Sequence, residues 1–177
     1  MSSDAALLDI RWTARLRAVR LLVLDFDGVL TDDRVLLGED GAEFVMCSRS
    51  DGMGLARLKA AGLPVMILSS ETNPVVSARA RKLGLPVEQG VCDKAAALRR
   101  LVETHGVTLA EVAYVGNDVN DVACLRLAGL AVTPADARPE ACACAHHVLD
   151  ACGGRGAVRE LCDALLSAQS AVLEGCA

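Results

Sequence analysis

Two aspartates separated by one residue follow directly on an apolar run near the start of the chain. Residues 21–24 read Leu-Leu-Val-Leu, and Asp25, Phe26, Asp27 and Gly28 come next. Because side chains alternate along a strand, the two carboxylates point to the same side. Two like charges beside a buried strand are costly unless something neutralises them. This spacing suits phosphoryl transfer, in which one carboxylate attacks phosphorus and the other moves the proton of the leaving oxygen.

Further polar residues stand where later apolar runs end. Ser69 and Ser70 close the run at 63–70, Lys94 begins a helical pattern, and Gly-Asn-Asp-Val-Asn-Asp occupies 116–121. Ligands of open parallel sheets bind beyond the carboxyl ends of the strands, so we expect these groups to meet there. Oxygen atoms suit Mg²⁺, whereas Ser69 and Lys94 suit the oxygens of a transferring phosphoryl group. The candidate metal ligands are Asp25, Asp27, Asn117, Asp118 and Asp121.

Strand-like runs alternate with helical patterns along the chain. We predict strands at 19–25, 63–70, 85–90, 112–116, 130–136 and 146–149, and helices at 51–62, 73–84, 93–106, 120–129 and 156–173. This alternation predicts an α/β fold with a parallel, Rossmann-like sheet covered by helices on both faces. A turn signal between 34–38 and 42–47 predicts a β-hairpin flap over about 33–48. We expect one domain over 1–177, ending in a tail at about 152–177.

Composition narrows the class of protein. Hydrophobic residues make up 53% of the 177 and aromatic residues 2%, so the core must be aliphatic. A net charge of −5 disfavours nucleic-acid binding, no apolar run is long enough to span a membrane, and no signal peptide is evident, so we expect a cytoplasmic protein. The eight cysteines are expected to be small buried hydrophobes. A zinc site at Cys142, Cys144, His146 and His147 is disfavoured, since these residues lie too close together.

Each feature also has a purely structural interpretation. The paired aspartates can cap a turn, Ser69 and Ser70 can cap a helix, and Lys94 can be a solvated helix start. The order of these features, and their shared place at strand ends, favours the catalytic interpretation.

Four segments, in their order along nearly the whole chain, resemble the motifs of the haloacid dehalogenase superfamily of phosphatases: LDFDGVLTD, LSSE, DK and GNDVND. The resemblance implies Mg²⁺ as cofactor and Asp25 as the nucleophile. It implies Asp27 as the acid/base and as a metal ligand through its backbone carbonyl, with Ser69 and Lys94 binding phosphate. One departure is Asn117, which stands where the family usually has aspartate. This change weakens metal binding or passes the ligand role to Asp118, with Asp121 in the outer coordination shell.

The chain lacks the length for a cap domain between these motifs. Three further segments resemble those of the small 3-deoxy-octulosonate 8-phosphate phosphatase group: SDGMGLARLKAAG, QGVCDK and GGRGAVRE. That resemblance implies a homotetramer, with hairpins packed together and a neighbour's tail at the active site, where Arg155 adds charge. Glu71 replaces the arginine usual in the octulosonate enzymes, and Lys82 lies three helical turns along, as in a nine-carbon branch. We therefore expect Ser70, Glu71 and Lys82 to bind substrate, Glu71 contacting sugar hydroxyls and Lys82 the carboxylate; the alternative is an ordinary surface charge pair.

Our leading hypothesis is a magnesium-dependent phosphatase that forms an aspartyl-phosphate and acts on a phosphorylated octulosonate or nonulosonate. The alternative is a catalytically weak oligomerisation module of sialic-acid-type sugar metabolism, which Asn117 favours. A phosphate-accepting receiver domain ranks last, because receivers lack the second aspartate and the hairpin.

Overall fold

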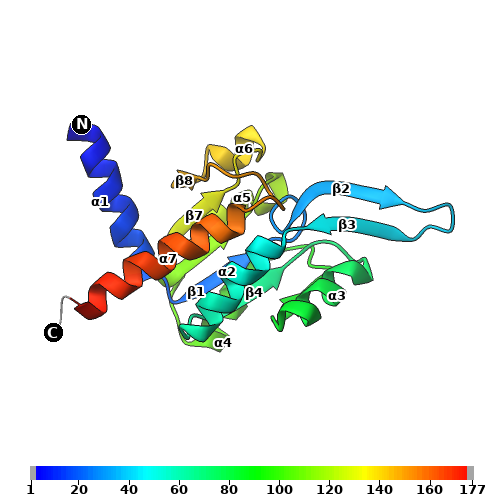
Figure 1. Ribbon diagram of the computed structural model, residues 1–177, viewed down its shortest axis with the longest axis horizontal. Coiled ribbons are helices and arrows are strands. Elements are labelled where there is room, and N and C mark those ends of the chain that lie inside the picture. Colours follow the sequence, from blue (N-terminus) through cyan, green and yellow to red (C-terminus); the bar gives the residue numbers. More distant parts are fainter. Residues whose placement is uncertain (1–2, 175–177) are drawn as a thin grey trace.

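The computed structural model describes residues 3–174, and the side chains of 10–170 within them. Six parallel strands form one sheet in the order β5-β4-β1-β6-β7-β8 (Figure 1). They are β1 (Leu21–Leu24), β4 (Val65–Leu68), β5 (Val87–Glu88), β6 (Val112–Val115), β7 (Leu130–Thr133) and β8 (His147–Val148). β1 lies between β4 and β6, so the residues that follow it emerge in the middle of the sheet edge. The predicted parallel α/β fold is confirmed, and residues 3–174 contain no cap domain.

Helices cover both faces of this sheet. One layer holds α1 (Ser3–Ala18), α2 (Arg49–Ala60), α3 (Pro74–Leu83) and α7 (Ala157–Glu174), and the other holds α4 (Lys94–His105), α5 (Val122–Leu127) and α6 (Pro139–Cys142). Successive residues of β1 point to opposite layers: Leu22 and Leu24 pack with the first, and Leu21 and Val23 with the second. All four are fully buried, as the central strand of a covered parallel sheet requires.

Local signals at the ends of α3 behave as the sequence predicts. The side chain of Asn73 accepts a hydrogen bond from the backbone N–H of Val75 at 3.0 Å, and Pro74 is the first helical residue. Gly84 ends the helix in the left-handed conformation, at φ +62°. Because α3 connects the parallel strands β4 and β5, it begins beside the carboxyl ends of the strands and ends beside their amino ends.

A β-hairpin projects beyond the carboxyl edge of the sheet (Figure 1). It consists of β2 (Thr31–Leu37) and β3 (Glu43–Cys47), paired antiparallel, at the position predicted for the flap. The hairpin carries five strongly exposed apolar side chains: Val35, Leu36, Leu37, Phe44 and Met46. We call these five residues the hairpin apolar patch.

Several expectations need correction. The helix α1 is not predicted by the sequence pattern, because its apolar residues show little amphipathic periodicity. The strand expected over 130–136 ends at Thr133, and the short helix α6 follows it. The amphipathic helix expected over 156–173, in the C-terminal tail, is present as α7, which packs on α2 and α1 and buries Val158, Leu161 and Leu165. Residues 175–177, with Cys176, lie outside the described part.

Cysteine burial is mixed. Cys124 and Cys162 are buried as expected, whereas Cys92 is exposed and the other described cysteines are half-buried. None of the helices between residues 3 and 174 is long and apolar enough to cross a membrane.

Candidate active site

The loop after β1 holds the two aspartates at the centre of the sheet edge. The backbone N–H of Asp25 donates to the carbonyl oxygen of Val115 at 2.9 Å, which extends the pairing of β1 with β6 by one residue. The Thr31 hydroxyl donates to Asp27 Oδ1 at 3.3 Å and accepts from the Gly28 backbone N–H at 3.2 Å. Gly28 has φ +68°, a conformation that glycine adopts without strain. A tight turn therefore presents Asp25 and Asp27 together.

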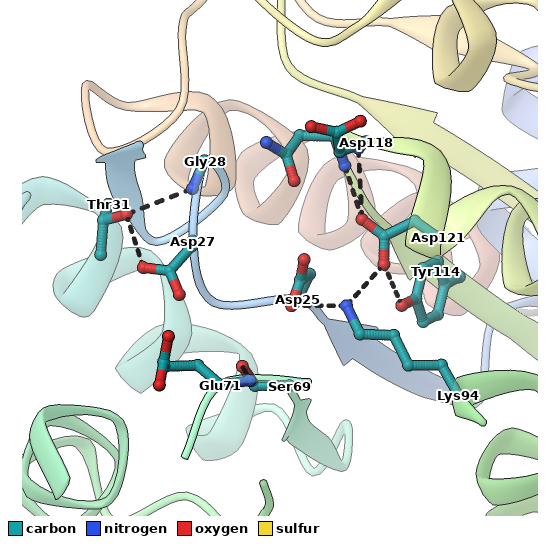
Figure 2. Close-up of polar contacts among 11 residues, drawn as sticks. Asp25, Asp27, Gly28, Thr31, Ser69, Glu71, Lys94, Tyr114, Asp118 and Asp121 are labelled. Carbon is teal, nitrogen blue, oxygen red and sulfur yellow. Dashed lines mark hydrogen bonds and ion pairs between the residues drawn. The ribbon is translucent and has the colours of Figure 1, made fainter. Parts of the chain in front are cut away.

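Lys94 lies between two buried carboxylates (Figure 2). Its Nζ is 2.8 Å from Asp25 Oδ1 and 2.8 Å from Asp121 Oδ1, and all three side chains are almost wholly buried. Burial disfavours the charge of Lys94, but the two carboxylates outweigh that effect and raise its pKa. The lysine therefore stays charged between two carboxyl groups. When both carboxyl groups are ionised, the excess of negative charge suits a site that also binds a metal ion.

Asp121 accepts hydrogen bonds on both of its carboxylate oxygens. Its Oδ1 accepts from Lys94 and, at 2.6 Å, from the Tyr114 hydroxyl. Its Oδ2 accepts from the backbone N–H of Asn117 at 2.9 Å and, at 3.4 Å, from that of Asp118. Asp121 therefore orients Lys94 and the 116–121 loop, and its place in the outer coordination shell of a metal stays a prediction.

Burial also changes the two aspartates of the first motif. The pKa of Asp25 is raised to about 8 by burial and by the charge of Asp121, and Lys94 opposes this rise. The pKa of Asp27 is raised by burial and by the nearby Glu71, and the Thr31 hydroxyl opposes that rise. With its raised pKa, Asp27 can hold a proton near neutral pH, as a general acid must, whereas Asp25 must lose its proton before it can attack.

A magnesium ion fits the oxygen atoms that remain unoccupied. The side chain of Asn117 is 7% exposed, lies against Gly28, and makes no hydrogen bond within the described residues. The Asp27 carbonyl oxygen likewise accepts no backbone hydrogen bond from residues 3–174. Together with Asp25 these atoms form an oxygen-only ligand set, which Mg²⁺ prefers. The described side chains contain no cluster of three or more His, Cys, Asp and Glu residues suited to a metal.

Asp118 is the other candidate ligand from the last motif. Its Oδ1 accepts from the backbone N–H of Val119 at 2.6 Å, and its Oδ2 lies 3.7 Å from Arg138 Nε. Its side chain is 40% exposed, so it remains accessible at the edge of the metal position.

The second motif contributes a buried hydroxyl. Ser69 is 1% exposed, and its Oγ accepts from the backbone N–H of Glu71 at 3.1 Å, which leaves its proton free for a phosphate oxygen. Glu71 Oε1 accepts from the backbone N–H groups of Thr72 and Asn73, at 2.6 and 2.7 Å. Figure 2 shows Ser69 and Glu71 below the two aspartates. Ser70 is exposed beside them.

Two predicted substrate ligands lie away from this centre. Lys82 is exposed in the last turn of α3, whereas Glu71 lies three residues before the helix begins. At about 1.5 Å per residue, Lys82 lies about 12 Å along the helix axis from Pro74. The substrate contacts expected of both residues stay predictions. Arg155 lies at the rim, its Nη2 3.6 Å from Asp32 Oδ2 of the same chain.

The closely spaced cysteines and histidines have structural partners. His146 Nδ1 accepts from the backbone N–H of Ala131 at 2.9 Å, and His147 stacks on Trp12 with ring centroids 4.0 Å apart. The Cys142 thiol donates to the carbonyl oxygen of Ala137 at 3.6 Å. These groups join α1, β7, α6 and β8, so they hold the edge of the fold together.

Sequence reasoning missed two residues of the site. Thr31 is part of the first motif, and its hydroxyl lies four residues after Asp27, where a tight turn returns it to that carboxylate. Tyr114 is the only tyrosine of the chain and stands inside a buried strand, where a hydroxyl needs a partner. The position of Tyr114 within an apolar strand therefore indicates, from the sequence alone, a buried polar partner.

Three comparisons with known proteins agree with this geometry. A profile of the haloacid dehalogenase-like hydrolases matches residues 55–159. The 3-deoxy-D-manno-octulosonate 8-phosphate phosphatase of Yersinia pestis is 38% identical over 158 residues, which cover 89% of this chain and 84% of that protein. A haloacid dehalogenase family hydrolase from Streptomyces avermitilis is 48% identical, with a TM-score of 0.83 over 84% of this chain and 86% of that one.

A further solved structure carries ligands. The 3-deoxy-D-manno-octulosonate 8-phosphate phosphatase of Moraxella catarrhalis, in complex with a magnesium ion, a phosphate ion and a KDO molecule, has a TM-score of 0.86 at 29% identity. The match covers 94% of this chain and 98% of that one.

The strand-end aspartates, the buried lysine and the parallel sheet define a phosphatase of the haloacid dehalogenase type. The chain belongs to the haloacid dehalogenase-like hydrolase family, so the family predicted from its motifs is confirmed.

Proposed function

We propose that this protein hydrolyses the phosphomonoester of a 3-deoxy-2-keto sugar acid, with Mg²⁺ as cofactor and through an aspartyl-phosphate. The observation that carries the proposal is Asp25, buried at the end of β1 with Lys94 Nζ 2.8 Å from its carboxylate and Asp27 two residues on. The magnesium ion in the Moraxella relative supports the cofactor. Residues 3–174 contain all the groups that the chemistry requires. A cytoplasmic location stays a prediction.

In the first step an Asp25 oxygen attacks phosphorus, and the bond from phosphorus to the sugar oxygen breaks. Lys94 and Ser69 bind the equatorial oxygens, where charge gathers in the transition state. Asp27 gives its proton to the departing sugar oxygen, which leaves as the alcohol. When bound, Mg²⁺ offsets the repulsion between the Asp25 carboxylate and the phosphate.

In the second step a water molecule attacks the phosphorus of the aspartyl-phosphate. Asp27, now a carboxylate, takes a proton from that water, and the bond between phosphorus and the Asp25 oxygen breaks. Phosphate leaves, and Asp25 and Asp27 return to their starting states. The Thr31 hydroxyl orients Asp27 in both steps through its hydrogen bond to Oδ1.

The substrate class rests on the named relatives. The relatives from Yersinia and Moraxella act on the eight-carbon octulosonate 8-phosphate by name, and their similarity supports a substrate of that kind. Glu71 at the rim of the site supports a nine-carbon nonulosonate 9-phosphate as the other member of the class. Its Oε2 makes no hydrogen bond within the described residues and can accept one from a sugar hydroxyl.

A phosphate-release assay tests the proposal. Purified protein with Mg²⁺ is given eight- and nine-carbon keto-acid phosphates, together with hexose and pentose phosphates as controls. We expect fastest release from one of the keto-acid phosphates and none from Asp25→Asn. Absence of release from the whole panel, with a folded wild-type protein, would refute the proposed function.

The alternative function is oligomerisation with little catalysis. Asn117, which brings no charge to the metal position, and the hairpin apolar patch favour it. The same patch supports our proposal that the protein is a homotetramer whose neighbours cover the active site. Light scattering gives the mass: a tetramer whose Asp25→Asn variant matches the wild type in every activity would favour the alternative.

A further inference from the structure

The loop 153–156 lies directly behind the turn that carries Asp27. The backbone N–H of Gly154 donates to the carbonyl oxygen of Val29 at 2.9 Å. A Cβ atom on Gly153 would lie 1.9 Å from the carbonyl oxygen of Gly28, and one on Gly154 would lie 2.5 Å from the carbonyl carbon of Thr31. Because real Cβ atoms do not approach so closely, only glycine allows this contact. The loop and the turn are therefore one packed unit.

Asp51, in the first turn of α2, holds the start of α7, which follows this loop directly. Its Oδ1 accepts from the backbone N–H of Arg159 at 2.8 Å. The residue is fully buried, and its Oδ2 has no hydrogen-bond partner in the described residues. Burying a carboxylate is unfavourable, and no step of the proposed chemistry uses this one. The contact with the first turn of α7 is what its burial provides.

Two more contacts fix the loop in place. The backbone N–H of Gly153 donates to Asp136 Oδ1 at 2.9 Å. Gly54 lets α2 and α7 approach closely, since a Cβ there would lie 2.9 Å from Arg159 Cδ and 3.0 Å from Cys162 Cβ. The sequence segments around Asp51 and around Gly153–Gly156, far apart along the chain, thus form a single support behind the active site.

We infer that Asp51 is a positioning residue that acts through the loop 153–156 to hold the Gly28–Thr31 turn, and with it the acid/base Asp27. This inference rests on the proposed function. Asp25 depends on the support less, because β1, its bond to Val115 and Lys94 hold it independently. Within the described residues, the Asp27 side chain is held in place by the turn and by its hydrogen bond from the Thr31 hydroxyl, as Figure 2 shows. Loosening the support therefore impairs proton transfer by Asp27 more than attack by Asp25.

Rapid mixing with p-nitrophenyl phosphate separates the two steps. Nitrophenolate leaves without a proton, so the first step does not need Asp27, whereas hydrolysis of the aspartyl-phosphate does. In Asp51→Ala we expect the initial burst of nitrophenolate to remain, close to one equivalent of enzyme. Steady-state turnover should fall about 10- to 100-fold, the range that misplaced catalytic groups produce. KM should change little.

Two further variants serve as a conservative replacement and as a control. Asp51→Asn retains an oxygen that accepts from the backbone N–H of Arg159, so it should restore most of the turnover. Asp163→Asn, on α7 at the same interface between α2 and α7, contacts Arg57 and Arg159 but not the loop, and it should behave as the wild type. Circular dichroism and thermal unfolding check that each variant is folded. If Asp51→Ala does not fold, Asp136→Ala replaces it and should show a smaller effect with the same retained burst.

Several outcomes would overturn the inference. Unchanged turnover in folded Asp51→Ala, or a burst that falls in parallel with turnover, would show that Asp51 does not act through Asp27. Loss of turnover in Asp51→Asn equal to that in Asp51→Ala would do the same. A wild-type protein that releases no phosphate would overturn the proposed function and this inference with it. An active wild type with unaffected Asp51→Ala would overturn this inference alone.

Discussion

The floor and the rim of the active site are held by different kinds of contact. On the floor, Lys94 lies 2.8 Å from both Asp25 and Asp121, and all three are almost wholly buried. At the rim, Arg155 is 63% exposed and lies 3.6 Å from its nearest carboxylate, on Asp32, and Ser70 is exposed. Charges on the floor cannot exchange their partners for water, whereas those at the rim can. The floor is therefore fixed within one chain, and the rim is open to substrate or to a neighbouring subunit.

Replacing Lys94 should have the largest effect and tests the floor directly. Lys94→Met leaves the buried Asp25 and Asp121 facing each other without a cation, which costs about 3–5 kcal/mol of unfolding free energy. Phosphate release should fall to background. Arg155→Met is the matched control at the rim, with a change in stability within about 0.5 kcal/mol. Urea unfolding and phosphate release measure both variants, and equal effects would break the distinction between floor and rim.

The affinity for Mg²⁺ should depend on pH through Asp25, on the floor of the active site. Burial and Asp121 raise the pKa of Asp25 to about 8, so below that pH the carboxyl must lose a proton before it can bind a metal. The affinity for Mg²⁺ should therefore rise between about pH 6 and pH 8, by at most about tenfold per pH unit. Calorimetry in two buffers of different ionisation enthalpy measures the proton that is released.

Stability without magnesium should show the opposite trend. Because the folded-state pKa of Asp25 lies above its usual value, its contribution is greatest at low pH and is lost as the pH rises through about 8. Asp25→Asn should remove this loss and should bind Mg²⁺ without releasing a proton. An affinity for Mg²⁺ that does not change with pH in the wild type would contradict the raised pKa.

Restoring the missing carboxylate should strengthen metal binding by a smaller amount. Asn117→Asp adds a negative charge next to Gly28, so the magnesium concentration for half-maximal activity should fall about tenfold. Without Mg²⁺ the variant should unfold more easily, because it adds a third anion beside Asp25 and Asp121. Asn120→Asp, in the same motif but exposed, is the control. Unchanged half-saturation in Asn117→Asp would mean that Asp118 is the ligand from this motif.

Glu71→Gln should have the smallest effect and tests the rim. The glutamine oxygen can still accept from Thr72 and Asn73, so stability should change by less than about 0.5 kcal/mol. Because Glu71 raises the pKa of Asp27, its loss should lower that pKa and move the alkaline limit of kcat/KM to lower pH. KM should rise a few-fold for the sugar-acid phosphate and stay constant for p-nitrophenyl phosphate, which has no hydroxyl groups to contact. Equal KM changes for both substrates would exclude a contact with sugar hydroxyls.

Local patterns predicted much of the fold and the floor. The strand runs, the caps of α3 and the hairpin flap follow from residue types within a few positions of each other, and the structure contains all of them. The motifs that supply Asp25, Ser69 and Lys94 end or follow parallel strands, so topology alone places them at one edge. The helix α1 escaped prediction because tertiary packing, and not amphipathic periodicity, holds it.

The sequence by itself determined the chemistry available at the sheet edge: which carboxylates, which lysine and which hydroxyl. Only the tertiary structure decided which of these groups face the substrate and which support the others, because hydrogen-bond partners depend on distances between segments that no pattern along the chain encodes. Asp121 accepts from Lys94, Tyr114 and two backbone N–H groups, contacts that come from three separate segments of the chain. The sequence likewise predicted the helix of the C-terminal segment, but only the fold shows that α7 packs on α2 and donates a hydrogen bond to the buried Asp51 from its first turn.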